Sequence, residues 1–196
     1  MKLGSFEIDL PSSPLRSPHC IAILRPWINV GNVGHTVLVR LSDIYDAKEI
    51  GRLEKPSSFY DFTRYRPEIR LLNDQRKISV PNTVVLAGRY PDTVLNKRDL
   101  LFFHMLEPHV NAEDFNDSII SLLRYFNVER YTVIGGMYDA VPHSRPLLVS
   151  GSAYGWEPSQ EFGDIEFGVS KYEGPTSLTS QIANRVNDEL GIETLS

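Results

Sequence analysis

Cysteine is almost missing from this sequence. The single one, Cys20, cannot form a disulfide within the chain. It stands in an apolar run over residues 20–24, which favours a buried and unreactive side chain. Basic residues are not in excess either, because 20 Lys and Arg stand against 25 Asp and Glu and give a net charge of −5. Since proteins that bind nucleic acid normally carry a basic patch or stripe, we expect no nucleic acid partner.

Long apolar runs are also missing. No stretch approaches the roughly 20 residues that a transmembrane helix needs. The first residues contain acidic side chains and lack the continuous apolar core of a signal peptide. We therefore expect a cytoplasmic protein without a membrane partner.

Known catalytic and cofactor motifs are missing as well. The chain has no G-x-S-x-G elbow and no H-E-x-x-H zinc motif, and its turn at residues 31–34 is neither a Walker loop nor a G-x-G-x-x-G fingerprint. The five histidines, at positions 19, 35, 104, 109 and 143, show no spacing typical of metal ligands. We therefore expect no metal and no cofactor, and we favour a protein that is not an enzyme.

What remains is the pattern of one globular domain. With 41% hydrophobic and 23% charged residues over 196 positions, the chain is long enough for one well-buried domain and short for two. A Pro- and Ser-rich lead-in predicts an N-terminal extension over residues 1–19 and a single α/β domain over residues 20–196.

Apolar periodicity predicts the elements of this domain. Helices are predicted from residue 33 with Asn32 as N-cap, over residues 114–126, and from a cap at Thr176 to Gly191. Strands are predicted at residues 20–24, 47–53, 83–87, 100–104, 131–134 and 147–150, with a hairpin formed by residues 69–72 and 77–80. This order predicts a mixed sheet covered by helices.

Five short motifs stand in the same order as in a known family. They are Trp-Ile-Asn-Val-Gly-Asn-Val-Gly at residues 27–34, Phe-Tyr-Asp-Phe-Thr-Arg-Tyr-Arg-Pro at 59–67, Glu-Pro at 107–108, Val-Pro-His-Ser-Arg-Pro at 141–146 and Tyr-Glu-Gly-Pro-Thr at 172–176. From about residue 20 to residue 191, the chain resembles the proteasome assembly chaperone 2-like family. It looks like a prokaryotic-type member that is short at its C-terminus.

The resemblance implies a fold and partners. It implies a three-layer sandwich with a mixed, mostly parallel sheet, similar to the phosphorylase/hydrolase-like folds. It also implies a homo-oligomer and a protein client such as proteasome-type subunits. Family members usually continue beyond the last helix, so we expect either a shortened member or a fragment that lacks C-terminal elements. The final Thr-Leu-Ser also lacks the hydrophobic-Tyr-x tail of archaeal relatives.

Polar residues gather where the predicted strands end, and parallel strands place such ends on one side of a sheet. Pro142 and Pro146 bracket His143, a candidate acid or base, and Arg145, a candidate ligand for carboxylate or phosphate. The glycine turn at residues 31–34 opens a helix, where an anion is favoured. Together with positions taken from the resemblance, these features predict a binding pocket of nine residues: Asn29, Gly31, Asn32, Asp61, Arg66, Glu107, His143, Arg145 and Thr176.

The same residues allow a structural interpretation. His143 and Arg145 would then tie their loop to backbone carbonyls or to Asp61, and the glycine turn would serve tight packing. The first functional hypothesis is accordingly a non-enzymatic, homo-oligomeric chaperone or scaffold. The alternative is an enzyme or a protein that binds a small anionic ligand in a strand-end pocket around His143. In an oligomer, we expect interface anchors among four aromatic residues: Trp27, Phe59, Tyr60 and Trp156.

Overall fold

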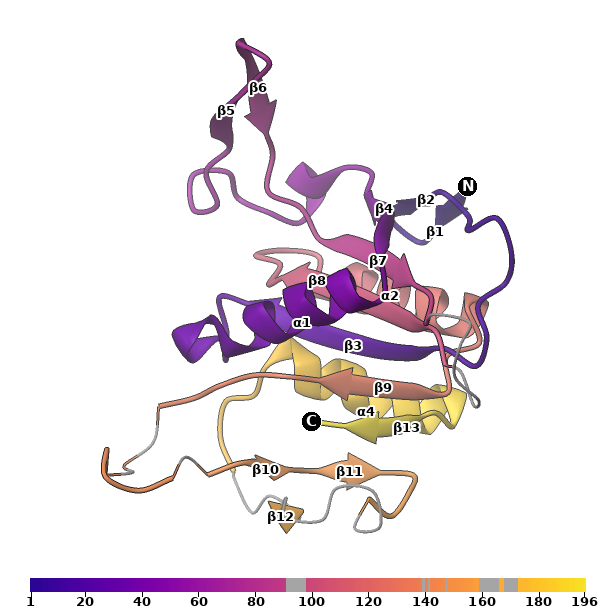
Figure 1. The fold of residues 1–196 in the computed structure, drawn as a ribbon, viewed down its shortest axis with the longest axis vertical. Coiled ribbons are helices and arrows are strands. Elements are labelled where there is room, and N and C mark those ends of the chain that lie inside the picture. Colours follow the sequence, from indigo (N-terminus) through magenta and orange to yellow (C-terminus); the bar gives the residue numbers. More distant parts are fainter. Residues whose placement is uncertain (91–97, 139, 141, 147, 159–165, 168–172) are drawn as a thin grey trace.

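The computed structural model describes residues 1–90, 98–138, 140, 142–146, 148–158, 166–167 and 173–196 (Figure 1). Its main feature is a sheet of nine strands with helices on both faces. In spatial order, the strands are β1 (Lys2–Leu3), β2 (Phe6–Ile8), β4 (Lys48–Leu53), β7 (Val84–Gly88), β8 (Leu100–Leu106), β3 (His19–Arg25), β9 (Arg130–Val133), β13 (Glu193–Leu195) and β11 (Ala153–Tyr154).

The directions of the strands correct one expectation from the sequence. A mixed sheet is confirmed, but a mostly parallel one is wrong. Only β8–β3, β3–β9 and β9–β13 are parallel pairs, and the other five pairs of neighbours are antiparallel. Among the described residues, no α-helix separates β4, β7 and β8 along the chain, and strands without a crossover turn back on one another.

The two faces of the sheet are covered by different helices. Along β8, Phe102 belongs to a small apolar cluster with Leu38 of α1 (Val33–Ile44). Its neighbours Leu101 and Phe103 belong to the main core, which also contains residues of α2 (Ala112–Tyr125) and α4 (Leu178–Leu190). Alternation along a strand therefore divides the apolar side chains between α1 on one face and α2 with α4 on the other.

A hairpin projects from this body. Its strands, β5 (Glu68–Leu72) and β6 (Gln75–Ser79), pair only with each other, and all ten residues are exposed. Figure 1 shows the pair standing away from the sheet at the top of the molecule. We call residues 66–80 the arm. A second small sheet joins β10 (Ser150–Gly151) to β12 (Glu166–Phe167). Two short 3-10 helices are η1 (Val30–Asn32) and η2 (Pro56–Ser58).

Most predicted elements are present, with small shifts at their ends. The hairpin, the three helices and the strands near residues 20, 50, 85, 100 and 131 are confirmed. The strand predicted at residues 147–150 is wrong, because Leu148 and Val149 have no regular structure and β10 begins only at Ser150; residue 147 lies outside the described residues. Thr176 does not cap α4, since Ser177 takes the N-cap position.

The first 19 residues contribute to the same sheet. Although β1 and β2 lie within the predicted N-terminal extension, β2 pairs with β4, and its Phe6 and Ile8 are buried in the main core. The boundary between residues 1–19 and 20–196 stays a prediction. None of the described helices combines the length and the apolar character that crossing a membrane requires.

Candidate functional site

Three segments with predicted site residues begin at one edge of the sheet. β3, β8 and β9 run parallel, so their carboxyl ends meet there. The loop after β3 is held to the segment after β9, because Gly136 N–H donates to the Ile28 carbonyl (2.7 Å) and Val30 N–H donates to the Gly136 carbonyl (3.1 Å). Glu107 follows β8, and its N–H donates to the Arg25 carbonyl (2.8 Å). The starts of these three segments therefore lie at one edge of the sheet.

The loop between β3 and α1 brings three of the nine predicted residues together. The Asn29 side-chain amide donates to Asn32 Oδ1 at 2.9 Å. Gly31 lies between them with φ of +63°, a left-handed conformation that glycine adopts readily. Asn32 takes the predicted N-cap position of α1, but its side chain makes no capping hydrogen bond. The start of α1 is therefore left without a side-chain cap.

A second group links Asp61 to the end of β8. Asp61 N–H donates to His109 Nδ1 (3.1 Å), and the Tyr65 hydroxyl donates to the Glu107 carbonyl (3.1 Å). The ring centroids of Tyr65 and His109 lie 4.5 Å apart. The Asp61 carboxylate accepts hydrogen bonds from the Thr63 hydroxyl and N–H, which lower the pKa of Asp61. Asp61 is thus tied to this edge through His109, a contact that the sequence did not indicate.

The other predicted residues are not drawn into these groups. Arg66, His143, Arg145 and Thr176 are exposed, and within the described part of the chain no hydrogen bond or ion pair joins any of them to the other five. The only hydrogen bond found for Arg145 there runs from its N–H to the Pro142 carbonyl (3.0 Å). A single pocket made from all nine residues stays a prediction.

The same edge carries three polar side chains that the sequence analysis did not single out. Arg25 ends β3, and His104 lies in β8 with only 8% of its surface exposed. His35, in the first turn of α1, packs edge-on against His104 with ring centroids 6.0 Å apart. A signal was available in the sequence. A basic residue that ends a buried strand and a histidine inside a run of buried apolar residues both mark places where polar groups need partners.

Burial and charge explain the state of His104. Burial first, then the positive charge of Arg25 and the neighbouring His35, lower the pKa of His104 to about 4. The ring is therefore neutral at neutral pH. No group of three or more His, Cys, Asp or Glu side chains suited to a metal ion occurs in the part of the chain that the structure describes.

The four aromatic residues that we expected at an interface differ in how far they are exposed. Trp27 is about half exposed, whereas Phe59 and Tyr60 are buried in the main core and cannot anchor an interface in this conformation. Trp156 is partly covered, since its Nε1 donates to the Thr194 carbonyl (3.1 Å) and the Arg130 guanidinium lies 3.7 Å from the ring centroid.

A known protein family and several solved structures are similar to this chain. The family model that matches residues 23–196 is that of the PAC2 family. The chain belongs to the PAC2 family. A crystal structure of a PAC2 family protein from Streptomyces avermitilis is 26% identical, with a TM-score of 0.76 over 91% of this chain and 73% of that one. No curated protein matches the sequence.

Two further solved structures share the fold of this chain. A proteasome-assembly chaperone homologue from Mycobacterium tuberculosis is 24% identical, with a TM-score of 0.74 over 90% of this chain and 72% of that one. An archaeal proteasome activator from Pyrococcus furiosus is 16% identical, with a TM-score of 0.67 over 100% of this chain and 79% of that one. At these identities the likeness concerns the fold.

Proposed function

We propose that this protein is a proteasome-assembly-chaperone-like scaffold, which binds other protein chains without catalysing a reaction and works as a homo-oligomer. Membership of the PAC2 family supports a chaperone-like role, as does the shared fold with a proteasome-assembly chaperone homologue and a proteasome activator. On the same grounds we propose a three-layer, phosphorylase/hydrolase-like architecture and proteasome-type subunits as clients.

The observation that carries this proposal is the apolar face of the arm. Ile69 and Ile78 are partners in the hairpin register, and Leu71 lies two residues from Ile69, so these three side chains share one face. Each is at least 64% exposed. Isolated two-stranded hairpins are marginally stable, and an exposed apolar face of this kind marks a surface that binds a protein.

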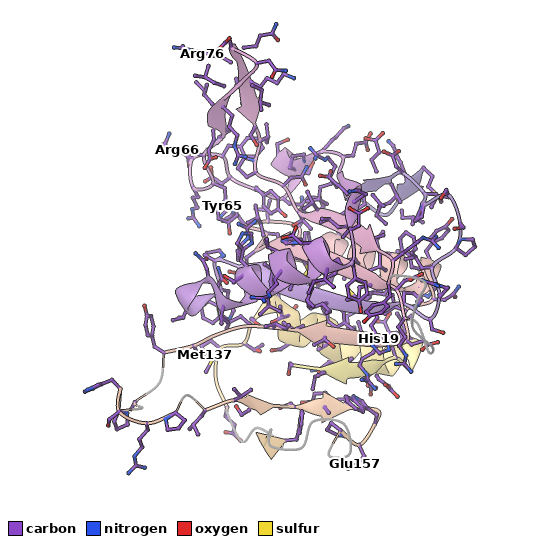
Figure 2. All side chains as sticks on the ribbon, viewed as in Figure 1. His19, Tyr65, Arg66, Arg76, Met137 and Glu157 are labelled. Carbon is purple, nitrogen blue, oxygen red and sulfur yellow. The ribbon has the colours of Figure 1, made fainter. Side chains whose placement is uncertain are left out.

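The charge of the arm favours an acidic partner. Residues 66–80 contain four basic and two acidic residues, a net charge of +2, while the whole chain carries −5, so the remainder carries −7. Figure 2 shows Arg76 near the tip of the arm and Arg66 near its base. Two arms packed face to face would bring like charges together, whereas an arm against the acidic body of a second copy pairs opposite charges. The occupant that we propose is therefore the body of a second copy.

Light scattering on arm variants tests this assembly. We expect the wild type at micromolar concentration to have a mass of two or more times 22.2 kDa. The double variant Ile69→Ser, Ile78→Ser should be a 22.2 kDa monomer. Ile44→Ser is the matched control, because Ile44 is an exposed apolar residue on the body, at the end of α1. Circular dichroism melting should show both variants folded. An arm variant that keeps the mass of the wild type would contradict the proposal.

The second candidate function is the binding of a small anionic ligand at the strand-end edge. It is favoured by one observation: buried polar side-chain atoms without hydrogen-bond partners gather there, at Arg25, Asn29 and His35. This candidate does not depend on the arm.

A further inference from the structure

We propose that the α1-facing side of the strand-end edge binds a small oxyanion, a carboxylate or a phosphate, between Arg25 and the start of α1. Residues alternate along β3 and β8, so Arg25 and His104 point to the same face as Ile23 and Phe102, the face that α1 covers. His35 reaches this place from α1 and packs against His104. The site uses none of the residues 142–146 that surround His143.

Unpartnered polar atoms are the first observation behind this site. Within the described residues, seven buried side-chain nitrogen or oxygen atoms have no hydrogen-bond partner, and three of them lie here: Arg25 Nε, Asn29 Oδ1 and His35 Nδ1. No hydrogen bond to the His104 ring is found there either, although that residue is more than nine-tenths buried. Buried polar groups in proteins are nearly always partnered, so this concentration of free polar atoms marks a place where a bound group can supply partners.

The start of α1 is the second observation. Gly34 lets the helix lie close to the sheet, because a Cβ there would come within 2.8 Å of Ile23 Cγ2 and 3.0 Å of the Ile134 carbonyl oxygen. No side chain caps this helix of 12 residues. The first backbone N–H groups of an α-helix lack intrahelical partners, and the helix dipole makes that end positive. Val33 N–H already donates to the Val30 carbonyl of η1, so an anion held there would receive the N–H groups that follow Val33 and the Arg25 guanidinium together.

The balance of charge decides the class of ligand. Arg25 forms no ion pair with any acidic side chain in the described part of the chain, and His104 contributes no charge at neutral pH. Glu107 follows the end of β8 at the same edge, and the negative charge of its side chain would repel an anion. A guanidinium with free donors binds planar carboxylates and phosphates through two hydrogen bonds. A metal cation is disfavoured beside Arg25.

Titration of the full chain with two oxyanions tests the site. Inorganic phosphate and acetate are added separately at pH 7 and constant ionic strength, with sodium chloride as the reference, and 1H–15N spectra are recorded. We expect a saturable shift of the Gly34 and His35 amides and of the His104 ring with at least one oxyanion. Phosphate alone would indicate a phosphorylated ligand, and acetate alone a carboxylate ligand. Shifts that only match those in chloride would overturn the proposal.

Variants separate binding at Arg25 from general screening. Arg25→Met should weaken the binding at least tenfold. Arg40→Met is the matched control, because Arg40 is an exposed residue of α1 without an ion pair in the described part of the chain, and it should leave the affinity unchanged. If Arg25→Met does not fold, Arg25→Lys keeps the charge without the Nε donor and should weaken binding at least threefold. Equal affinity in wild type and Arg25 variants would refute the site.

Discussion

At the scale of single residues, the clearest departure from the sequence analysis is which histidine is buried among polar groups. His143, bracketed by two prolines, is exposed, whereas His104 lies inside a strand with 8% of its surface exposed. Motif reading favours the bracketed residue because its neighbours are conspicuous. Burial of His104 follows from the position of β8 between β7 and β3, and sequence order alone does not reveal that position.

Acid should destabilise the fold through His104. Its folded-state pKa is about 4, and an unfolded histidine has a pKa near 6.5, so between these values the unfolded chain takes up a proton that the folded protein does not. The stability contributed by the neutral ring is present above pH 6.5 and is lost as the pH falls toward 4. At pH 5 the loss is about 2 kcal/mol.

Urea unfolding at pH 7 and pH 5 measures this loss. In His104→Phe, the drop in unfolding free energy between the two pH values should shrink by most of that amount. His19, whose pKa is also lowered to about 4 by burial and by Arg98, remains in the variant and accounts for part of the residual drop. An unchanged pH dependence in His104→Phe would show that the His104 ring of the wild type takes up protons equally in the folded and unfolded states.

At the scale of elements, the helices and the hairpin of the arm can be predicted from the sequence, whereas the shortest strands cannot. The helices carry apolar residues at helical spacing over 12 residues or more, and the arm is marked by its Asn-Asp turn. β1, β2, β10, β11, β12 and β13 span only two or three residues each, too few for an alternating pattern to show. Strand direction was misjudged although the helices were placed correctly, because it also depends on which strands lie side by side, and the spatial order of the sheet does not follow the order of the chain.

Close contact between α1 and the sheet depends on Gly34. Alanine at this position would place a Cβ within 2.8 Å of Ile23 Cγ2 and 3.0 Å of a backbone oxygen that cannot move freely. Overpacking should outweigh the gain in helix propensity, so Gly34→Ala should lower the unfolding free energy by about 1 kcal/mol. Thr36→Ala, at an exposed position of the same helix, is the control and should not destabilise. Equal or higher stability of Gly34→Ala would contradict this packing.

Hydrogen exchange should rank the strands. β9 lies between β3 and β13, with Tyr131 and Val133 buried, whereas β5 and β6 pair only with each other in solvent. We expect the amides of residues 131–133 among the slowest to exchange and those of the arm among the fastest. Fast exchange throughout residues 131–133 would contradict an interior strand. Slow exchange in the arm would indicate that a partner covers it.

At the scale of the whole molecule, the family was predictable, whereas the contacts of the candidate site were not. Five motifs in register indicated the PAC2 family, and residues 23–196 match its model. The hydrogen bond between Asp61 and His109, however, joins residues 48 positions apart, and the groups around Arg25 meet only because β3 and β8 are neighbours and α1 packs His35 against His104. The same scale shows the contrast between a basic arm and an acidic body, which favours assembly between copies.

Native mass spectrometry of the purified, untreated protein tests the homo-oligomeric scaffold most directly, since it reports the assembled mass of the intact chain. We expect the dominant species at micromolar concentration to have a mass of two or more times 22.2 kDa. Its population should fall as ionic strength rises, because opposite charges add to the apolar contact between the arm and a second copy. A spectrum containing only the 22.2 kDa monomer at low ionic strength would contradict a homo-oligomer.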